Sequence, residues 1–549
     1  MKTRVLRLAK SALAILAVSM GACSDRTPPG IVAIELVPND NVKAPLAAKL
    51  RMTTDEPTRL AFEIDDGQRR WTVSPDGDDC PLGIDHEAPV LGLHAAREHS
   101  IVVVATDAAG NETRSEPFEI TTPSPPELFP DFEVVVREPE RMEPGFTFFN
   151  LRAMPEEGSV SDYGVLVAVD DTGEVVWLFN TDHDITDARH LKNGNVLYES
   201  SRRGNAYEID MLGNVVRQWH TTGIPKTDVP ERSIPLETDA IHHEILEMPS
   251  GNLLALSAEL REFEDYPTSE EDADAPRAKS TVVGDVLIEF TRDGTIVEEI
   301  PLLDVLDPYR IGFASLDGGY WKEAYKDRTT EDLRDWSHTN AVFYDEKDDA
   351  FVVSARRQDA VYKVTRDGEL VWILGNHDNW REPWSRKLLT PRGELDWFYH
   401  QHAPKVTPQG TILLFDNRTY GASPFTGQKP VPAEENYSRA VEYEIDEESM
   451  EARQVWSYGG KDAERFYSQY IGDADWLPRT GNILVTDGGK YTDADGNPVS
   501  SPGTLRWARV VEVTHTTPPE KVFELHITDE PPMGFHVYRA DRIPTLYPE

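Results

Sequence analysis

Cysteine is scarce in this chain, whose 549 residues include only Cys23 and Cys80. If Cys23 carries another modification, Cys80 has no partner, so no intrachain disulfide holds the fold. Basic residues are also few, with 55 Lys and Arg against 97 Asp and Glu and a formal charge of −42. That charge repels phosphate backbones and anionic headgroups, so we expect no nucleic-acid partner.

Long apolar runs are also rare. The run "SALAILAVSM" at residues 11–20 is shorter than the ~20 residues of a membrane span. It follows the cationic segment "MKTRVLRLAK" and precedes "GAC", so residues 1–23 are predicted to be an export signal. The stretch "MGAC" resembles a bacterial lipoprotein signal with Cys23 as the lipidated residue, and Ser24 favours the outer membrane. We therefore expect a periplasmic protein that contacts the membrane only through a lipid anchor. A plain secretory signal is the alternative, and it also implies export.

The chain is too long for one hydrophobic core, so at least two domains are expected. Residues 29–122 alternate apolar and polar side chains with period two, as in "RLAFEIDD" and "SIVVVATD", between Asp-Gly and Gly-Asn turns. This pattern predicts a small β-sandwich, and "VVVATDAAGN" resembles immunoglobulin-like or fibronectin-like domains. Residues 123–132, "PSPPELFPDF", have the composition of a stiff Pro-rich linker.

One theme then repeats over residues 133–549. A turn followed by an apolar strand occurs as "DDTGEVVWLF", "DMLGNVVRQW", "TRDGTIVEEI" and "TRDGELVWIL", and more loosely as "ESMEARQVWSY" and "PPEKVFEL". Repeated small β units with no long helix predict an all-β fold, and six recurrences predict a six-bladed β-propeller. A double sandwich is the competing fold, but it does not explain why the same turn-and-strand motif is repeated. Residues 262–280, "EFEDYPTSEEDADAPRAKS", are expected to be a loop insertion.

Histidines recur at one place in this repeat. His243 lies eight positions before Gly251, and His402 lies eight positions before Gly410. His338 in "DWSHTNAVFYDEKDD" falls within one step of the same place in another blade, as His242 does beside His243. Each histidine alone is best explained as a hydrogen-bonded structural residue, but three in register predict convergence on the propeller axis.

Such a cluster suits several chemistries. Neutral imidazole can ligate a metal, act as a general base or attack an electrophile. Arg356 and Arg357 in "FVVSARRQDAV" add cationic donors, and Asn340 adds an amide. Arginine beside histidine disfavours a divalent cation and suits a tetrahedral oxyanion. The pattern therefore predicts an anion site with a nucleophile.

The segments "DAIHHEI", "DWSHTNAVFYDEKDDAFVVSARRQDAVYKVTRDGELVWILG" and "QHAPKVTPQGTILLFDN" resemble the bacterial arylsulfate sulfotransferases. Members of that family have a six-bladed propeller after a small β-sandwich. The resemblance implies that His402 takes a sulfuryl group from an aryl sulfate and passes it to a phenol, without a nucleotide sulfate donor. It also implies the other site residues: catalytic His338 and Arg356, and substrate-binding His243, His242, Asn340 and Thr486.

The resemblance implies a ping-pong reaction through a sulfohistidine, with no metal and no organic cofactor. The partners are then an aryl sulfate donor and a phenolic acceptor, and the sequence leaves open a homodimer. One departure from the family pattern is that Ala403 and Pro404 follow the predicted nucleophile, where an acidic residue is common. Two other functions stay open: a metal-dependent hydrolase that uses the same histidines, and a ligand-binding propeller without turnover.

Overall fold

The computed structural model describes residues 26–75, 81–155, 162–224, 229–329, 332–461, 464–500, 505–529 and 533–548. The predicted signal, Cys23 and Cys80 lie outside these residues. Almost all regular structure in the described chain is strand, as predicted. Within it, no helix has the length and apolar character needed to cross a membrane.

The N-terminal domain is one curled sheet of seven strands, which fits the predicted sandwich. Its longest strand, β2, pairs with four others, so the sheet bends around one core. Buried and accessible side chains alternate along β2 and β5, which is the period-two pattern of the sequence. The strands are β1 (Ile31–Pro38), β2 (Ala48–Asp65), β3 (Arg70–Val73), β4 (Gly83–Val90), β5 (Glu98–Asp107), β6 (Glu112–Arg114) and β7 (Phe118–Thr121).

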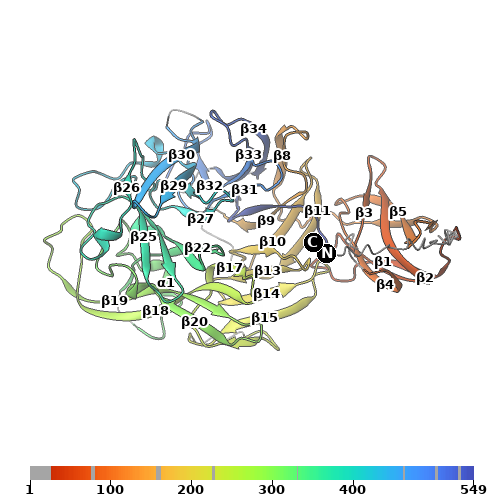
Figure 1. The fold of residues 1–549 in the computed structure, drawn as a ribbon, viewed down its shortest axis with the longest axis horizontal. Helices are drawn as coiled ribbons and strands as arrows, with labels where there is room; N and C mark the ends of the chain where they lie inside the picture. The colour runs from red at the N-terminus through yellow and green to blue at the C-terminus, as the bar shows by residue number, and fades with distance from the viewer. Residues whose placement is uncertain are drawn as a thin grey trace, which may run out of the picture.

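Six further sheets form the blades of a propeller (Figure 1). Blade 1 contains β9 (Phe146–Ala153), β10 (Gly164–Val169), β11 (Val175–Thr181), β35 (Phe535–His536) and β36 (Ala540–Ile543). Blade 2 contains β12 (Ala188–His190), β13 (Val196–Ser200), β14 (Asn205–Ile209), β15 (Val215–Thr221) and β16 (Ile234–Leu236). Blade 3 contains β17 (His242–Glu247), β18 (Leu253–Tyr266), β19 (Ala278–Phe290), β20 (Ile296–Pro301) and β21 (Leu333–Asp335).

The remaining three sheets complete the ring. Blade 4 contains β22 (Thr339–Asp345), β23 (Ala350–Ala355), β24 (Ala360–Thr365) and β25 (Leu370–Gly375). Blade 5 contains β26 (Thr390–Pro391), β27 (His402–Val406), β28 (Ile412–Asp416), β29 (Arg439–Asp446) and β30 (Glu451–Gly459). Blade 6 contains β31 (Asp473–Trp476), β32 (Ile483–Thr492), β33 (Leu505–Val513), β34 (Lys521–Thr528) and β8 (Asp131–Arg137). The short helices are η1 (Leu302–Asp304), α1 (Gly319–Lys322), η2 (Arg356–Gln358), η3 (Trp384–Lys387) and η4 (Ala433–Glu435).

Each of the six repeated phrases provides a turn and an outer strand of a different blade, namely β11, β15, β20, β25, β30 or β34, so the blade count is confirmed. In four of them a glycine provides the turn, for example Gly294 with a φ of 88°. Each pair of neighbouring blades shares a hydrophobic cluster. The segment 262–280 is only partly a loop, because β18 runs on to Tyr266 and β19 begins at Ala278.

Both ends of the propeller chain close the ring. β8, the first strand of this part of the chain, pairs with β34 at the edge of blade 6. β35 and β36, the last strands, pair with β9 in blade 1. Residues far apart in the sequence therefore lie side by side at the seam between blades 1 and 6.

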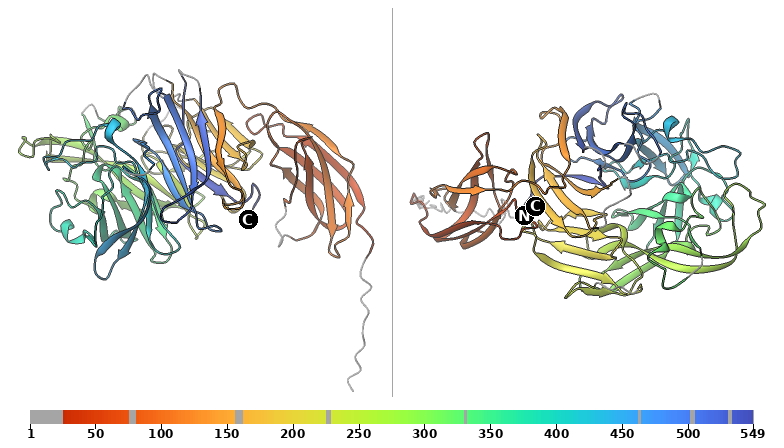
Figure 2. Two further views of the ribbon diagram at one scale, coloured as in Figure 1. Left: turned by 90° about the horizontal axis from the view of Figure 1, so that it is seen from above. Right: turned by 180° about the vertical axis from the view of Figure 1, so that it is seen from behind.

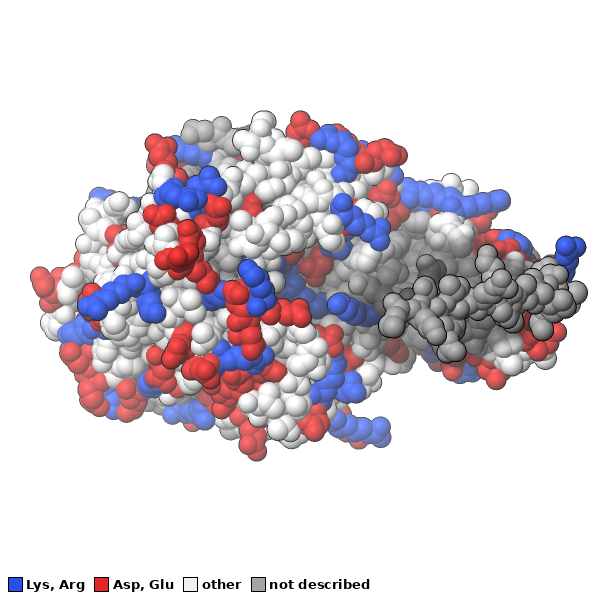
Figure 3. All heavy atoms as spheres, viewed as in Figure 1, with Lys and Arg blue, Asp and Glu red and all other residues white. Residues whose placement is uncertain are grey.

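The N-terminal sheet contacts blade 1 (Figures 1 and 2). The backbone N–H of Ala95 donates to the carbonyl of Val175 at 3.0 Å, next to a hydrogen bond between Nε2 of His94 and Asp170 at 3.3 Å. Over the face of the propeller in Figure 3, acidic and basic side chains are interspersed. On this face the charges of both signs are mixed, so it does not indicate a partner of one particular charge.

Candidate active site

A cavity of about 970 Å³ at the propeller's centre is lined by three histidines. His243 lies in β17, His338 directly precedes β22, and His402 begins β27. These are the first strands of blades 3, 4 and 5, and they contact one another around the channel. The ring centroids of His243 and His338 are 4.9 Å apart. The structure therefore brings together the three histidines that the aligned turns placed in register.

The backbone at these histidines leaves the regular strand. The pairing register of β17, β22 and β27 shifts at the cavity end of each strand. His243 and His338 have positive φ angles of 61° and 46°. Such angles are uncommon outside glycine, and they cluster at functional sites. A β-bulge also redirects side chains, which explains how the adjacent residues His242 and His243 face different surroundings.

Asn417 holds His402 in one tautomer. The side-chain amide of Asn417 donates to the backbone carbonyls of Ser468 and Ile471, each at 2.8 Å. Its Oδ1 can then only accept, and it lies 2.6 Å from Nδ1 of His402. Nδ1 therefore carries the proton, and the lone pair is on Nε2, which accepts a 3.3 Å bond from the backbone N–H of Ile471. The nitrogen available for attack is thus Nε2.

The charge state of His402 follows from its surroundings. Burial, and then the positive charge of Arg356, lowers the pKa of His402 well below its ordinary value. Burial, and then the neighbouring His338, does the same to the pKa of His243. Both rings are therefore neutral near pH 7. A neutral imidazole is the form that can act as a nucleophile.

His338 is paired with a carboxylate that the sequence analysis did not single out. Nδ1 of His338 donates to Oδ2 of Asp335 at 2.6 Å, which leaves Nε2 for the cavity. Burial alone raises the pKa of Asp335, but Arg357 and His338 outweigh it and lower the value to about 2. The pKa of His338 is lowered by burial, against the opposing effect of Asp335. An oriented imidazole beside a fixed carboxylate is the arrangement of a general acid–base.

His242 and His243 form a chain of hydrogen bonds. Nε2 of His242 donates to the backbone carbonyl of Ser257 at 3.0 Å, and its Nδ1 lies 2.8 Å from Nδ1 of His243. Because His242 can then only accept at Nδ1, His243 is protonated at Nδ1 and presents Nε2 without a proton. His243 lines the cavity, whereas His242 lies behind it. His242 thus orients its neighbour.

The two adjacent arginines have different partners. Arg357 forms an ion pair with Asp335 at 3.1 Å and donates to a backbone carbonyl. Arg356 makes one long contact, 3.5 Å from Nη2 to the carbonyl of Gln469, and no ion pair with a described residue. Burial, and then Arg357, lowers the pKa of Arg356 to about 10, so it stays cationic near pH 7. Arg356 is therefore a charge in the cavity without a compensating carboxylate.

Asn340 and Thr486 do not line the cavity. The amide of Asn340 donates to the backbone carbonyl of Gln401 at 2.8 Å, directly before His402. The hydroxyl of Thr486 accepts from the backbone N–H of Ala540 at 3.1 Å. In this arrangement Asn340 supports the strand that carries His402, and Thr486 supports the strand that closes blade 1.

Two tyrosines that the sequence analysis missed form aromatic walls. Tyr320 lines the cavity and is 44% exposed, and its ring centroid lies 5.3 Å from that of His243 and 4.9 Å from that of His338. The ring of Tyr538 lies 6.2 Å from His243 and 6.5 Å from His402. Flat aromatic surfaces next to the histidines suit a substrate with an aryl ring.

Asp335 could have been recognised from the sequence as a partner of His338, because it lies three residues before that histidine in "DWSH".

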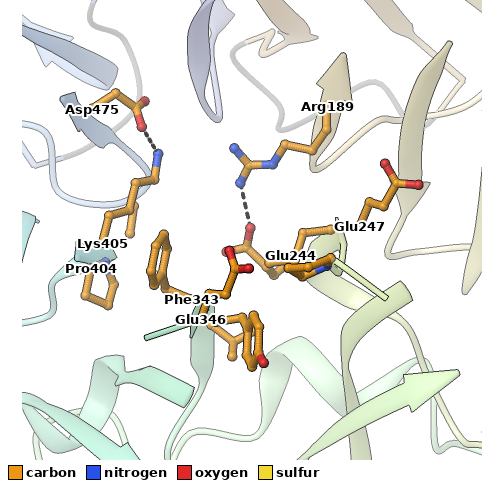
Figure 4. Close-up of a pocket in the computed structure, with 13 residues that line it drawn as sticks. Arg189, Glu244, Glu247, Phe343, Glu346, Pro404, Lys405 and Asp475 are labelled. Atoms are coloured by element: carbon orange, nitrogen blue, oxygen red, sulfur yellow. Dashed lines mark hydrogen bonds and ion pairs between the residues drawn. The ribbon is translucent and has the colours of Figure 1, made fainter. Parts of the chain in front are cut away.

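A network of ion pairs occupies the channel beyond the histidines (Figure 4). Arg189 binds Glu244 at 2.6 Å, and Lys405 binds Asp473 at 2.9 Å and also Asp475. The small pocket at this place has a volume of about 380 Å³, and Ala403 and Pro404 line it. The residues that follow His402 therefore face this second pocket, and Asn417 orients the imidazole instead.

The fold and the cavity define a six-bladed propeller whose central cavity is lined by histidines and arginines. A sequence model of the arylsulfotransferase (ASST) family matches residues 132–539, which is most of the chain. The protein therefore belongs to the arylsulfotransferase family, and the resemblance noted in the sequence is confirmed.

Two curated relatives are both called "Arylsulfate sulfotransferase AssT", from Escherichia coli O6:H1 and Lelliottia amnigena. Each is 26% identical over 419 residues, and each match covers 68% of this chain and 64% of the relative. The chain thus spans less than two thirds of the length of these relatives. Among solved structures, a protein of unknown function from Bacteroides caccae matches 71% of this chain and 98% of its own. The two chains are 11% identical, with a TM-score of 0.35.

Proposed function

We propose that the protein transfers a sulfuryl group from an aryl sulfate to a phenol by a ping-pong mechanism through His402. The observation that carries the proposal is the fixed tautomer of His402, with Nδ1–H bonded to Asn417 and an unprotonated Nε2. Arg356 lines the same cavity and offers a cationic donor to an oxyanion. Membership of the arylsulfotransferase family supports the reaction class.

In the first half-reaction, Nε2 of His402 attacks the sulfur of the aryl sulfate. The N–S bond forms as the S–O bond to the aryl group breaks, and the electron pair leaves on the phenolate. His338 takes up a proton at Nε2 when the sulfate anion binds and then gives that proton to the phenolate. Asp335 stabilises the imidazolium until the proton is transferred. Arg356 binds the sulfuryl oxygens, over which negative charge spreads in the transition state.

In the second half-reaction, the acceptor phenol replaces the released phenol. Nε2 of His338 takes its proton, the phenol oxygen attacks sulfur, and the N–S bond breaks to restore His402. His338 releases the proton gained from the acceptor when the product leaves, because its free ring is neutral, and takes up another when the next sulfate anion binds. The cycle therefore balances without a net proton, and it needs no metal or organic cofactor.

One observation also favours a zinc hydrolase. Three imidazoles with unprotonated Nε2 atoms are a common donor set for catalytic zinc. The described His, Cys, Asp and Glu residues whose ligand atoms lie within 4.8 Å of one another form two other groups, however: Asp66, His94 and His99, and Asp473, Asp475 and Asp541. The charge of Arg356 also disfavours a divalent cation, so the geometry supports the transferase better.

The proposal is tested by incubating the purified protein with 4-nitrophenyl sulfate, with and without phenol. We expect nitrophenol release that depends on phenol and yields phenyl sulfate. With the donor alone, the peptide that contains His402 should gain the mass of one SO₃ group. Steady release of inorganic sulfate that requires zinc, together with tightly bound zinc found by elemental analysis, would identify the hydrolase instead. Binding of aryl sulfates without any release would identify a binding propeller.

Arg356→Met should lower kcat/KM for the aryl sulfate by about 10²–10³, as the loss of one oxyanion donor does elsewhere. Methionine keeps much of the length of the side chain but removes its charge and its N–H groups. Initial rates at several donor concentrations measure the effect, and Arg356→Lys, which keeps the charge, should recover part of it. An unchanged kcat/KM in the methionine variant would remove Arg356 from the mechanism.

Binding of an aryl sulfate should take up a proton near neutral pH. Burial keeps the pKa of His243 and of His338 below the ordinary value of 6.5, so the free rings are neutral. Sulfuryl oxygens only accept hydrogen bonds, and a bound anion raises the pKa of a neighbouring histidine. Between the free and the bound pKa, affinity should therefore fall as pH rises, by up to about tenfold per unit. Calorimetry in buffers of different ionisation enthalpy counts the proton, and a constant affinity from about pH 6 to pH 8 would contradict the prediction.

We also propose that the mature protein is exported and anchored by lipid at Cys23 in the outer membrane, facing the periplasm. The support is the sequence of residues 1–23 alone. Metabolic labelling with a fatty acid and detergent partitioning test it, with Cys23→Ser expected in the soluble fraction. An unlabelled, soluble wild-type protein would overturn the anchor. A homodimer is likewise a proposal, which light scattering of the protein tests.

A further inference from the structure

Arg152 is a second cavity arginine without a compensating carboxylate. It lies in β9 of blade 1 and lines the same cavity as the histidines. Two other arginines in the interior of the propeller, Arg189 and Arg539, do have a carboxylate partner, because both bind Glu244. Within the described part of the chain, Arg152 makes neither a hydrogen bond nor an ion pair. A guanidinium inside a protein costs free energy when no carboxylate compensates its charge, although this chain has an excess of acidic residues and a formal charge of −42. An anionic ligand would compensate that charge.

Two sets of neighbours place this side chain in the cavity. Arg152 pairs with His536 across β9 and β35, so the two side chains share one face. His536 is bonded to the hydroxyl of Tyr470, a residue of the cavity wall, at 2.8 Å. The charge of Arg152 acts on the pKa of His536 and also on that of His243, after burial in both cases. Arg152 therefore lines the cavity beside His536, and it shares that lining with Tyr470 and His243.

The surroundings leave the charge of Arg152 uncompensated. Burial raises the pKa of Glu199, a carboxyl on which Arg152 acts, well above its ordinary value, so Glu199 is not a counter-ion. The cavity, at about 970 Å³, lies near the top of the range for small-molecule sites, so it has room beyond one phenol ring and a sulfuryl group. A planar guanidinium matches a carboxylate through two parallel hydrogen bonds.

We propose that Arg152 binds a carboxylate on the phenolic acceptor, so that the preferred acceptors are phenols that carry a carboxylate. This inference rests on the proposed function and specifies its substrate class. Arg356 binds the sulfuryl group, and Arg152 binds the anionic end of the aromatic molecule. Tyr320 and Tyr538 provide the aromatic walls between them.

The test compares 4-hydroxybenzoate with 4-hydroxybenzamide, acceptors of similar size that differ in charge. In the wild type, kcat/KM should favour the acid by about tenfold or more, which is the effect of one charge-assisted contact. Arg152→Met should lower this ratio toward one, and Arg152→Lys should recover part of it. Arg203→Met is the matched control, because Arg203 also lines the cavity but has Asp162 as an ion-pair partner at 3.7 Å. That variant should keep the wild-type ratio.

A wild-type ratio near or below one overturns the inference, and so does a ratio that Arg152→Met leaves unchanged. Either result leaves sulfuryl transfer to phenol intact. If no phenol is sulfated at all, the proposed function fails, and calorimetric binding of the two acceptors decides the inference by itself. Tighter binding of the acid that is lost in Arg152→Met supports it, whereas equal binding of acid and amide overturns it. Thermal melts of the variants show whether each is folded.

Discussion

Replacing His402 by alanine should lower phenol-dependent release of nitrophenol by about 10⁴-fold or more, as the loss of a covalent nucleophile does in other enzymes. Alanine removes Nε2, and His243 and His338 are engaged through their Nδ1 atoms in other hydrogen bonds. The variant should also fail to gain an SO₃ group from the donor. Stopped assays with phenyl sulfate as product, together with intact-protein mass spectrometry, measure both losses.

His400→Gln is the matched control for this experiment. His400 lies two residues away, is buried, and bonds through Nδ1 to Asp359 at 3.0 Å, but it does not line the cavity. Its replacement should lower the melting temperature more than the rate. Full activity of His402→Ala, combined with loss of activity when His243 or His338 is replaced, would move the nucleophile to one of those rings.

Asp335→Asn should reduce transfer by about 10²–10⁴, the range of general acid–base catalysis. The carboxylate accepts a hydrogen bond from Nδ1–H of His338. It also favours the protonated ring, whereas burial lowers the pKa of His338. Asparagine can present an N–H group to His338 and so favour the wrong tautomer. The loss should be largest when the donor is the sulfate of a weakly acidic phenol and the acceptor is a weakly acidic phenol. It should be smallest when the donor releases nitrophenolate, which is a good leaving group. Rates across a series of substituted phenols measure this dependence.

Asp285→Asn is the control for this variant. Asp285 is buried nearby and accepts the backbone N–H of Thr339 at 2.9 Å. Burial, and then the charge of Asp335, raises the pKa of Asp285 to about 7, so removing its charge changes less. A uniform loss over all phenols in Asp335→Asn, equal to that in Asp285→Asn, would indicate damage to the fold instead of lost proton transfer.

The blade count and the convergence of histidines could be predicted because both are local properties. A turn and the strand after it fit in ten residues, and a fixed spacing from a turn fixes a place in the blade. The partner of His402 could not be predicted in this way. Asn417 is held by carbonyls that lie 51 and 54 residues further along the chain, in the segment that connects β30 to β31 of the next blade.

The bulges were equally hidden. A strand pattern predicts strict alternation of faces, whereas β17 and its neighbours depart from it where the site is built. Asn340 and Thr486, which the family resemblance implied to be substrate-binding, are not among the residues that line the cavity, and their side chains bond to the backbone. The long hairpin of β18 and β19 was also missed, because its charged residues look like a loop.

Because both ends of the propeller chain meet at one seam, the cavity is complete only after the last strands have been added. Tyr538 lies between β35 and β36, so the last strands that close the ring also place one wall of the cavity. Until they dock beside β9, the three histidines exist without an enclosed, water-poor space that keeps them uncharged. We therefore expect a chain still being made, or one frayed at this seam, to lack the proposed transferase activity until the last strands have docked.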